Sequence, residues 1–328
     1  MKHVLVVLLG IIRVLLILWA TAALYLDARW TSLRLPLAVL FGVAMLAVWI
    51  VFFKRPALTR AAHLGGFVVV LGWWLTLRPA NDRDWQPDVA VLAYADIAGD
   101  QVTVHNIRNC DYRTATDFDV RHYDMTFDLG QLRSADLFMV YWGSPHMAHT
   151  MISFGFEGGD HLCFSIEARK EKGERYSPVR GLFRQYELVY VVADERDAVR
   201  VRTNYRPGED VYLLPLSGSQ AQLRALLDDY LGRVNRLRHH AEWYGTVTDN
   251  CTVSIRNQRA AANRMPWDWR LLLNGHADEL LYERGMITIN LPLAELKQGG
   301  HINARAKVAD QSTDFSQLIR QGISGLEL

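Results

Sequence analysis

Three long apolar runs at the start of the chain constrain its fold more than any other feature of the sequence. They cover about residues 4–26, 35–53 and 61–77, and Arg13 is the one charge inside the first of them. A helix needs roughly 20 apolar residues, within a range of about 17–25, to cross the hydrocarbon core of a bilayer. We therefore expect an N-terminal bundle of three transmembrane helices within residues 1–80.

The Lys and Arg residues between these runs predict the orientation of the bundle. Residues 54–60 contain three Lys/Arg and no acid, whereas residues 27–34 contain two Arg and one Asp. Loops rich in Lys and Arg remain in the cytoplasm. The sequence therefore predicts a multi-pass protein with a cytoplasmic N-terminus, and after three crossings everything beyond Arg78 faces the periplasm or the cell exterior.

The charge balance of the remaining chain limits its partners. Residues 1–80 contain eight Lys/Arg and one acid, so the other residues hold 28 bases and 34 acids. An acidic soluble part argues against nucleic-acid binding, which needs a basic surface to meet phosphates. The 35 aromatic residues of the chain also exclude a disordered protein.

Residues 81–87 are polar and bounded by proline, and we expect them to link the bundle to a domain over residues 88–328. The apolar spacing in that domain is mostly short and typical of strands, with a helix-spaced pattern over 220–235 and further helices expected near 251–263 and 277–284. The fold class expected is α+β, an antiparallel sheet with packed helices. The last 20 residues are polar, and we expect them to be loosely held. Candidate strands are 122–129, 136–142, 147–156, 162–168, 187–193 and 211–216.

Several chemistries lose support because their motifs are missing. The sequence has no Gly-rich phosphate loop, no His-Glu-x-x-His helix, no Gly-x-Ser-x-Gly elbow and no paired-Cys zinc pattern. His146 and His149 form a His-x-x-His pair, to which His122 or Asp136 would have to add a third metal ligand. Residues three apart on a strand face opposite sides, so we expect no metal site. We also expect no cofactor.

Cysteine is the most informative residue type for chemistry. The chain has Cys110, Cys163 and Cys251, so in an oxidising compartment one is left over from any pair. Cys251 stands where a polar stretch turns into an apolar periodic one, as at the start of a helix. Unpaired amides at such a position lower the pKa of a thiol and favour the reactive thiolate. The alternatives are a buried structural cysteine or a disulfide to either of the others.

A thiolate nucleophile needs a base, and His149 stands where a strand begins. A hairpin through Gly158 and Gly159 would bring Glu167 of the next strand beside His149, so that the carboxylate orients the imidazole through its other nitrogen. Taken singly, His149 is better interpreted as a satisfied core or loop histidine. Glu167 taken singly is better interpreted as the ion-pair partner of Arg169 or of another surface base.

The ordered combination of several short motifs resembles the Lnb N-terminal periplasmic domain family, also called DUF4105. The resemblance covers roughly residues 85–265. The motifs are Asn106-Ile107-Arg108-Asn109-x-Asp111-Tyr112-Arg113, His149-Thr150-x-x-Ser153-Phe154-x-Phe156, Ser165-x-Glu167-x-Arg169, Tyr186-Glu187-Leu188-x-Tyr190-Val191, Asp194-Glu195 and Asn250-Cys251-Thr252.

This resemblance implies a papain-like fold of circularly permuted type, in which the histidine precedes the cysteine along the chain. It implies a thiol nucleophile at Cys251, a general base at His149 and an orienting carboxylate at Glu167. The family's namesakes are implicated in acylating lipoprotein N-termini with a phospholipid as acyl donor, in the envelope of bacteria. This chain departs from them in having its membrane helices before the domain and Cys110 where an aromatic residue is expected.

We therefore expect a membrane-tethered cysteine acyltransferase of the bacterial inner membrane, acting on membrane lipid and on an amine such as a lipoprotein N-terminus. Amides near Asn250 would hold the oxyanion, and Arg108 and Arg113 would hold a lipid phosphate, with ordinary ion pairing as their alternative. Two other hypotheses remain open, a papain-like peptidase or amidase of the envelope and a non-catalytic binding module. The sequence does not indicate the oligomeric state.

Overall fold

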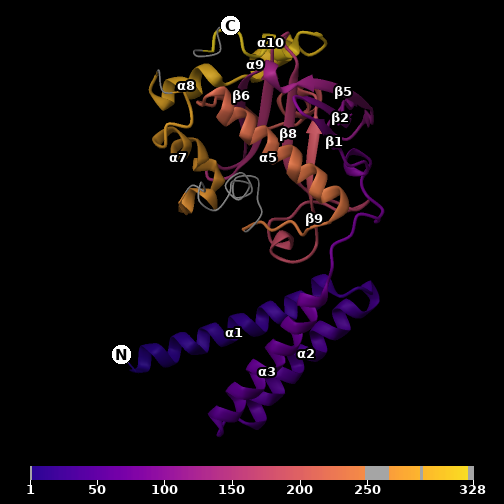
Figure 1. Ribbon diagram of the computed structural model, residues 1–328. Helices are drawn as coiled ribbons and strands as arrows, with labels where there is room; N and C mark the ends of the chain where they lie inside the picture. Colours follow the sequence, from indigo (N-terminus) through magenta and orange to yellow (C-terminus); the bar gives the residue numbers. More distant parts are fainter. Residues whose placement is uncertain (1, 248–265, 289–290, 324–328) are drawn as a thin grey trace. The chain divides into compact units, whose positions relative to one another are not determined.

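The structure, a computed structural model, describes residues 2–247, 266–288 and 291–323. It divides into two compact units (Figure 1). The first consists of Met1–Pro79 together with Tyr176–Tyr186, and the second of Ala80–Arg175 together with Glu187–Leu328. The second unit is an α+β domain that follows an apolar three-helix bundle, which is the predicted fold class.

The three N-terminal helices are α1 (Lys2–Asp27), α2 (Thr31–Val51) and α3 (Pro56–Thr76), and each is long and apolar enough to cross a membrane. Helices α2 and α3 begin four to five residues before their apolar runs. Pro56 explains the early start of α3, because proline is tolerated in the first helical turn, where its missing N–H has no partner to lose.

Small residues and aromatic rings hold the first unit together. Ala20 and Ala23 of α1 are completely buried, which lets neighbouring helices approach closely. The ring of Trp19 lies edge-on to Phe67, with centroids 5.8 Å apart, and to Trp74 at 5.2 Å. The bundle is thus closed at the C-terminal ends of α1 and α3 by aromatic packing.

An eight-stranded sheet is the centre of the second unit. Seven strands follow the order β1-β2-β9-β8-β7-β6-β10. The eighth, β5, lies off this path and pairs with β2. Every neighbouring pair is antiparallel except β2 and β9, which meet in parallel at Arg108 and Ala193. The strands are β1 (Tyr94–Ala98), β2 (Gln101–Arg108), β5 (His122–Asp128), β6 (Leu132–Trp142), β7 (Ala148–Phe156), β8 (His161–Arg169), β9 (Glu187–Ala193) and β10 (Glu209–Pro215), and a separate small pair is β3 (Asp111–Tyr112) with β4 (Phe118–Asp119).

One face of the sheet is covered by α5 (Gln220–His239), which lies across the strands in Figure 1. The helix starts with a capping box formed by Ser219 and Gln222. Its buried Tyr230 packs edge-on against Phe154 and Phe164 of neighbouring strands, with centroids 5.9 and 5.1 Å apart. The predicted helix over 220–235 is therefore present and extends by one further turn.

Short helices cover the other face: α4 (Glu195–Ala198), α9 (Asn303–Val308) and α10 (Phe315–Leu318). Helices α7 (Ala277–Glu283) and α8 (Leu293–Gly300) precede α9 in the chain. Phe315 and Ile319 are completely buried and join the same apolar cluster as Phe138. The expectation of a loosely held tail was wrong up to residue 323, because apolar residues spaced four apart fasten this polar segment to the sheet.

A buried ion-pair cluster lies under this tail. Arg320 contacts Asp136 of β6 at 2.8 Å and Glu195 of α4 at 2.6 Å, and both carboxylates are completely buried. Burial opposes ionisation of Glu195, but Arg320 outweighs it and lowers the pKa of Glu195 to about 2. The C-terminal segment is therefore held by charge as well as by apolar packing.

Replacing Arg320 by methionine should destabilise the domain strongly, because two buried carboxylates would lose their counter-charge. Loss of one partner from a buried ion pair costs about 3–5 kcal/mol. Urea unfolding of the full-length protein in detergent, followed by tryptophan fluorescence, measures the free energy of unfolding. The matched control is Arg113→Met, which removes exposed ion pairs with Asp117 and Asp119 and should change little. Equal effects of the two substitutions would contradict the role given to Arg320.

Candidate active site

The β7–β8 hairpin places His149 and Glu167 side by side. The antiparallel register pairs Met151 with Ser165, so His149 and Glu167 are the next pair on the same face of the sheet. The distance from His149 Nε2 to Glu167 Oε1 is 3.9 Å. The juxtaposition expected from the Gly158-Gly159 turn is therefore present in the structure.

A serine hydroxyl lies between the two groups. His149 Nε2 is 2.7 Å from Ser165 Oγ, and Ser165 Oγ donates to Glu167 Oε1 at 2.7 Å. A hydroxyl has only one proton, so Ser165 accepts from Nε2–H of the imidazole while it donates to the carboxylate. This arrangement fixes the tautomer of His149 and leaves its Nδ1 as the nitrogen with a lone pair.

Arg202 supplies the positive charge that keeps Glu167 ionised. Its guanidinium, from the π-helical turn η4 (Val201–Tyr205), lies 3.2 Å from Glu167 and 3.4 Å from Glu209. Burial opposes ionisation of Glu167, but Arg202 and then His149 outweigh it, so the pKa of Glu167 is held well below its ordinary value. Glu167 is thus a fixed acceptor at the end of a Glu167–Ser165–His149 relay.

The same surroundings keep the imidazole uncharged. Burial first, and Arg202 second, lower the pKa of His149 to about 3, although Glu167 acts in the opposite direction. His149 is therefore neutral at pH 5 and above. Such an imidazole keeps a lone pair that can accept a proton, and it does not form an ion pair with a thiolate in advance.

Sequence reasoning found two members of this group by their roles and missed two. Ser165 entered only as part of a motif, yet its spacing from Glu167 on one strand already places both on one face. Arg202 comes from a turn 35 residues further along the chain than Glu167. No local pattern identifies that contact.

The two described cysteines are unreactive thiols. Cys110 and Cys163 are buried and free, so the disulfide that the sequence left open between them does not form. Burial raises the pKa of Cys110 to about 12, with Asp197 as the next cause, and burial also raises the pKa of Cys163. The predicted nucleophile Cys251 and the adjacent Asn250 lie outside the described residues, as does the helix expected near 251–263.

Both arginines predicted to hold a lipid phosphate are paired with carboxylates. Arg108 is buried and donates from Nε and Nη2 to Asp197, at 2.9 and 2.8 Å. The exposed Arg113 pairs with Asp117 and Asp119 at 2.6 and 2.8 Å. Ion pairing, the alternative that the sequence left open for both residues, is the arrangement in the structure.

The two histidines of the His-x-x-His pair do not converge. His146 lies before β7, and its Nδ1 is 2.9 Å from Nε2 of His276. His276 in turn contacts Glu279 at 3.1 Å. His149 instead faces Ser165, so the pairing of His146 with a residue 130 positions away was not visible in the sequence.

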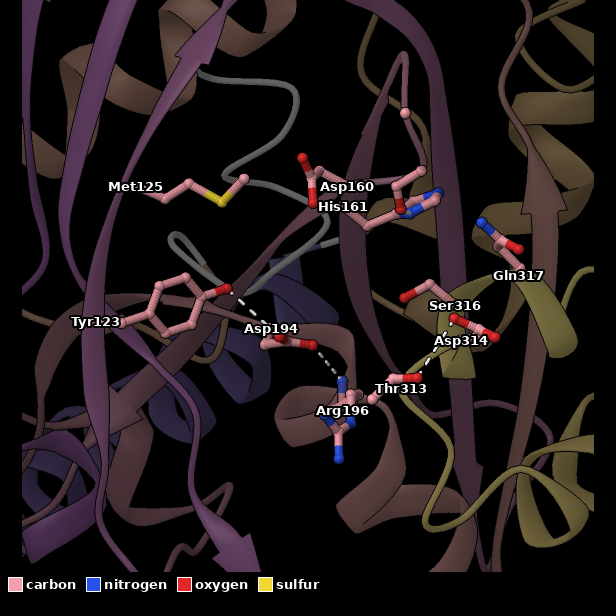
Figure 2. Close-up of a pocket in the computed structure, with 12 residues that line it drawn as sticks. Tyr123, Met125, Asp160, His161, Asp194, Arg196, Thr313, Asp314, Ser316 and Gln317 are labelled. Atoms are coloured by element: carbon pink, nitrogen blue, oxygen red, sulfur yellow. Dashed lines mark hydrogen bonds between the residues drawn. The ribbon is translucent and has the colours of Figure 1, made fainter.

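A polar cleft of about 250 Å³ lies at the other end of the hairpin from His149. Figure 2 shows Tyr123, Asp194 and Arg196 on one side of it and Asp160 with His161 on another. Strands rise about 3.3 Å per residue, so the length of β7 separates this cleft from His149 by roughly 20 Å. The cleft therefore plays no part in the candidate active site.

Comparison with models of known protein families gives a match. Residues 119–275 match the model of the family described as Lnb N-terminal periplasmic domain. This part of the chain carries the sequence pattern of that family's domain. The match includes His149, Ser165, Glu167 and Cys251. No curated protein matches the chain, and no solved structure matches it.

The Lnb N-terminal domain and the three apolar helices together place the protein in the cell envelope. The helices are long and apolar enough to cross a membrane, and the family is named for a periplasmic domain. The protein is a membrane protein with a periplasmic domain. The papain-like topology implied by the resemblance stays a prediction.

The low pKa of His149 should appear in the pH dependence of stability. The unfolded chain binds a proton at this histidine near pH 6.5, whereas the folded domain does so only near pH 3, so acidification from pH 6.5 to 5 favours unfolding. Wild-type protein should therefore lose its stability advantage over His149→Gln across this window. Urea midpoints at each pH measure the difference.

The control for this experiment is His105→Gln, which should show the opposite trend. Hydrogen bonding to Asp124 raises the pKa of His105, so its contribution is present at acidic pH and is lost as the pH rises. The wild-type advantage over this variant should grow on acidification. A constant difference between wild type and His149→Gln would show that the imidazole of His149 is solvated like an ordinary one.

Proposed function

We propose that the protein is an envelope acyltransferase that moves an acyl group from a membrane lipid to an amine through a thioester on Cys251. The observation that supports this most directly is the relay from Glu167 through Ser165 to His149, which leaves Nδ1 of the imidazole as a proton acceptor. A neutral, oriented imidazole is what a thiol nucleophile requires. The match to the Lnb N-terminal periplasmic domain family supports the same conclusion.

The first half-reaction forms the acyl-thioester. His149 Nδ1 takes the proton of the Cys251 thiol, and the sulfur attacks an ester carbonyl of the lipid. Backbone amides near Asn250 and Cys251 hold the oxyanion. Collapse of the intermediate breaks the ester bond, and the imidazolium returns its proton to the leaving alkoxide, which departs as lysolipid.

The second half-reaction uses the same groups in the reverse sense. An amine, such as a lipoprotein N-terminus, attacks the thioester while His149 accepts its proton. The carbon–sulfur bond breaks, the amide forms, and the proton passes to the departing sulfur of Cys251. No cofactor takes part in either half-reaction.

The membrane topology that we propose suits a lipid substrate. The three helices cross the inner membrane with the N-terminus in the cytoplasm, as the Lys/Arg-rich segment 54–60 predicts. The domain then stands on the periplasmic side, covalently attached close to the lipid surface. The lipid and the lipoprotein N-terminus are the partners in this proposal.

The thioester can be trapped directly. Full-length protein in vesicles containing phospholipid with a radiolabelled acyl chain should acquire a hydroxylamine-labile label, because the acyl group rests on a sulfur. Cys251→Ser should acquire no such label. Two results would contradict the proposal: a label on wild type that does not depend on the Cys251 thiol, or no label under turnover conditions with a lipoprotein peptide. Either would leave a hydrolase or a binding module as the function.

The relay predicts a graded series of rates for thioester formation. His149→Gln should slow it by about 10²–10⁴, the range for loss of a general base. Ser165→Ala should cause a smaller loss, because the imidazole remains but loses the acceptor that fixes its tautomer. Single-turnover labelling measures both rates.

His161→Gln is the matched control for the rate series, since His161 lies at the polar cleft on the same hairpin and not in the relay. It should label at the wild-type rate. Equal losses in His161→Gln and His149→Gln would remove His149 from the mechanism.

A further inference from the structure

A segment of the chain between β8 and β9 belongs to the membrane unit. Residues Tyr176–Tyr186 form one compact unit with Met1–Pro79, although they are flanked on both sides by residues of the periplasmic domain. The chain thus passes between the two units after residues 79, 175 and 186. Neither composition nor motif separates this segment from the rest of the domain.

Buried polar contacts fasten the segment to the ends of α1 and α3. The side-chain amide of Gln185 donates to Leu26 O at 2.8 Å and to Asp27 Oδ1 at 2.6 Å. The other carboxylate oxygen of Asp27 accepts from Trp74 Nε1 at 2.7 Å. Gln185 and Asp27 are both buried, so these bonds fix the segment at the level where the membrane helices end.

Aromatic and cationic contacts strengthen the same junction. The ring of Phe183 stacks on Trp19 at 6.2 Å, and the guanidinium of Arg184 lies 4.1 Å from the ring centre of Trp74. Arg184 also donates to Leu77 O at 2.5 Å. Tryptophans at the ends of membrane helices mark the boundary between lipid headgroups and acyl chains, so this segment lies at that boundary.

Other apolar side chains of the segment are exposed. Val179 is 63% exposed and stands directly before the short helix η3 (Arg180–Leu182). Leu182, the last residue of η3, is 49% exposed. The segment contains two Arg and no acid. Exposed apolar groups together with positive charge match the acyl chains and phosphates of the bilayer interface.

We propose that residues 176–186 form a membrane-interface wedge, seated in the leaflet on the side of the periplasmic domain. Val179 and Leu182 enter the acyl region, and Arg180 lies against lipid phosphates. The occupant of this surface is a phospholipid leaflet because the surface belongs to the same unit as helices long and apolar enough to cross a membrane. The wedge does not depend on the chemistry of Cys251.

Site-specific fluorescence in the full chain tests the wedge. In a Cys251→Ser background, Val179→Cys and Leu182→Cys are each labelled with an environment-sensitive fluorophore, because the other two cysteines are buried. The protein is reconstituted into vesicles of phosphatidylethanolamine and phosphatidylglycerol. We expect blue-shifted emission and quenching by lipids that carry a nitroxide on the acyl chain.

Val308→Cys is the matched control, since Val308 is an apolar residue of α9 in the other unit and is 91% exposed. Its label should emit as in water and be quenched by aqueous iodide. The same aqueous behaviour at residues 179 and 182 would overturn the wedge. Because the background lacks the Cys251 sulfur, neither result depends on whether the protein transfers acyl groups.

Discussion

The register of the β7–β8 hairpin is the constraint on which the candidate active site depends. Because the pairing of Met151 with Ser165 continues to His149 and Glu167, three side chains from two strands lie in one line on one face of the sheet. A slip of one residue would turn each of them to the other face, against α5. The glycine pair in the turn, both at positive φ, permits the tight connection that sets this register.

Buried arginines pair with buried carboxylates throughout the domain. Arg202 pairs with Glu167, Arg108 with Asp197, and Arg320 with Asp136 and Glu195. Each pair joins segments far apart in the chain, so the charges also specify which segments meet. A buried carboxylate without its arginine would take up a proton or unfold the site.

Sequence reasoning succeeded where structure follows from neighbouring residues and failed where it depends on distant ones. The hairpin, the membrane helices and α5 all follow from local periodicity and turn residues. Strands β1 and β2 were missed because polar side chains such as Asp96 and Asn106 interrupt the apolar alternation, and β2 has a register shift between Val104 and Ile107. The anchoring of Tyr176–Tyr186 depends on the carboxylate of Asp27, 158 positions before Gln185, which no local pattern reveals.

The burial of two cysteine thiols matters for a protein domain in an oxidising compartment. Cys110 and Cys163 stand in separate apolar clusters and remain protonated, so neither exchanges with disulfides in its surroundings. Neither thiol is therefore available as a disulfide partner for a sulfur elsewhere in the chain. Burial, and not a disulfide between them, protects both sulfurs from oxidation.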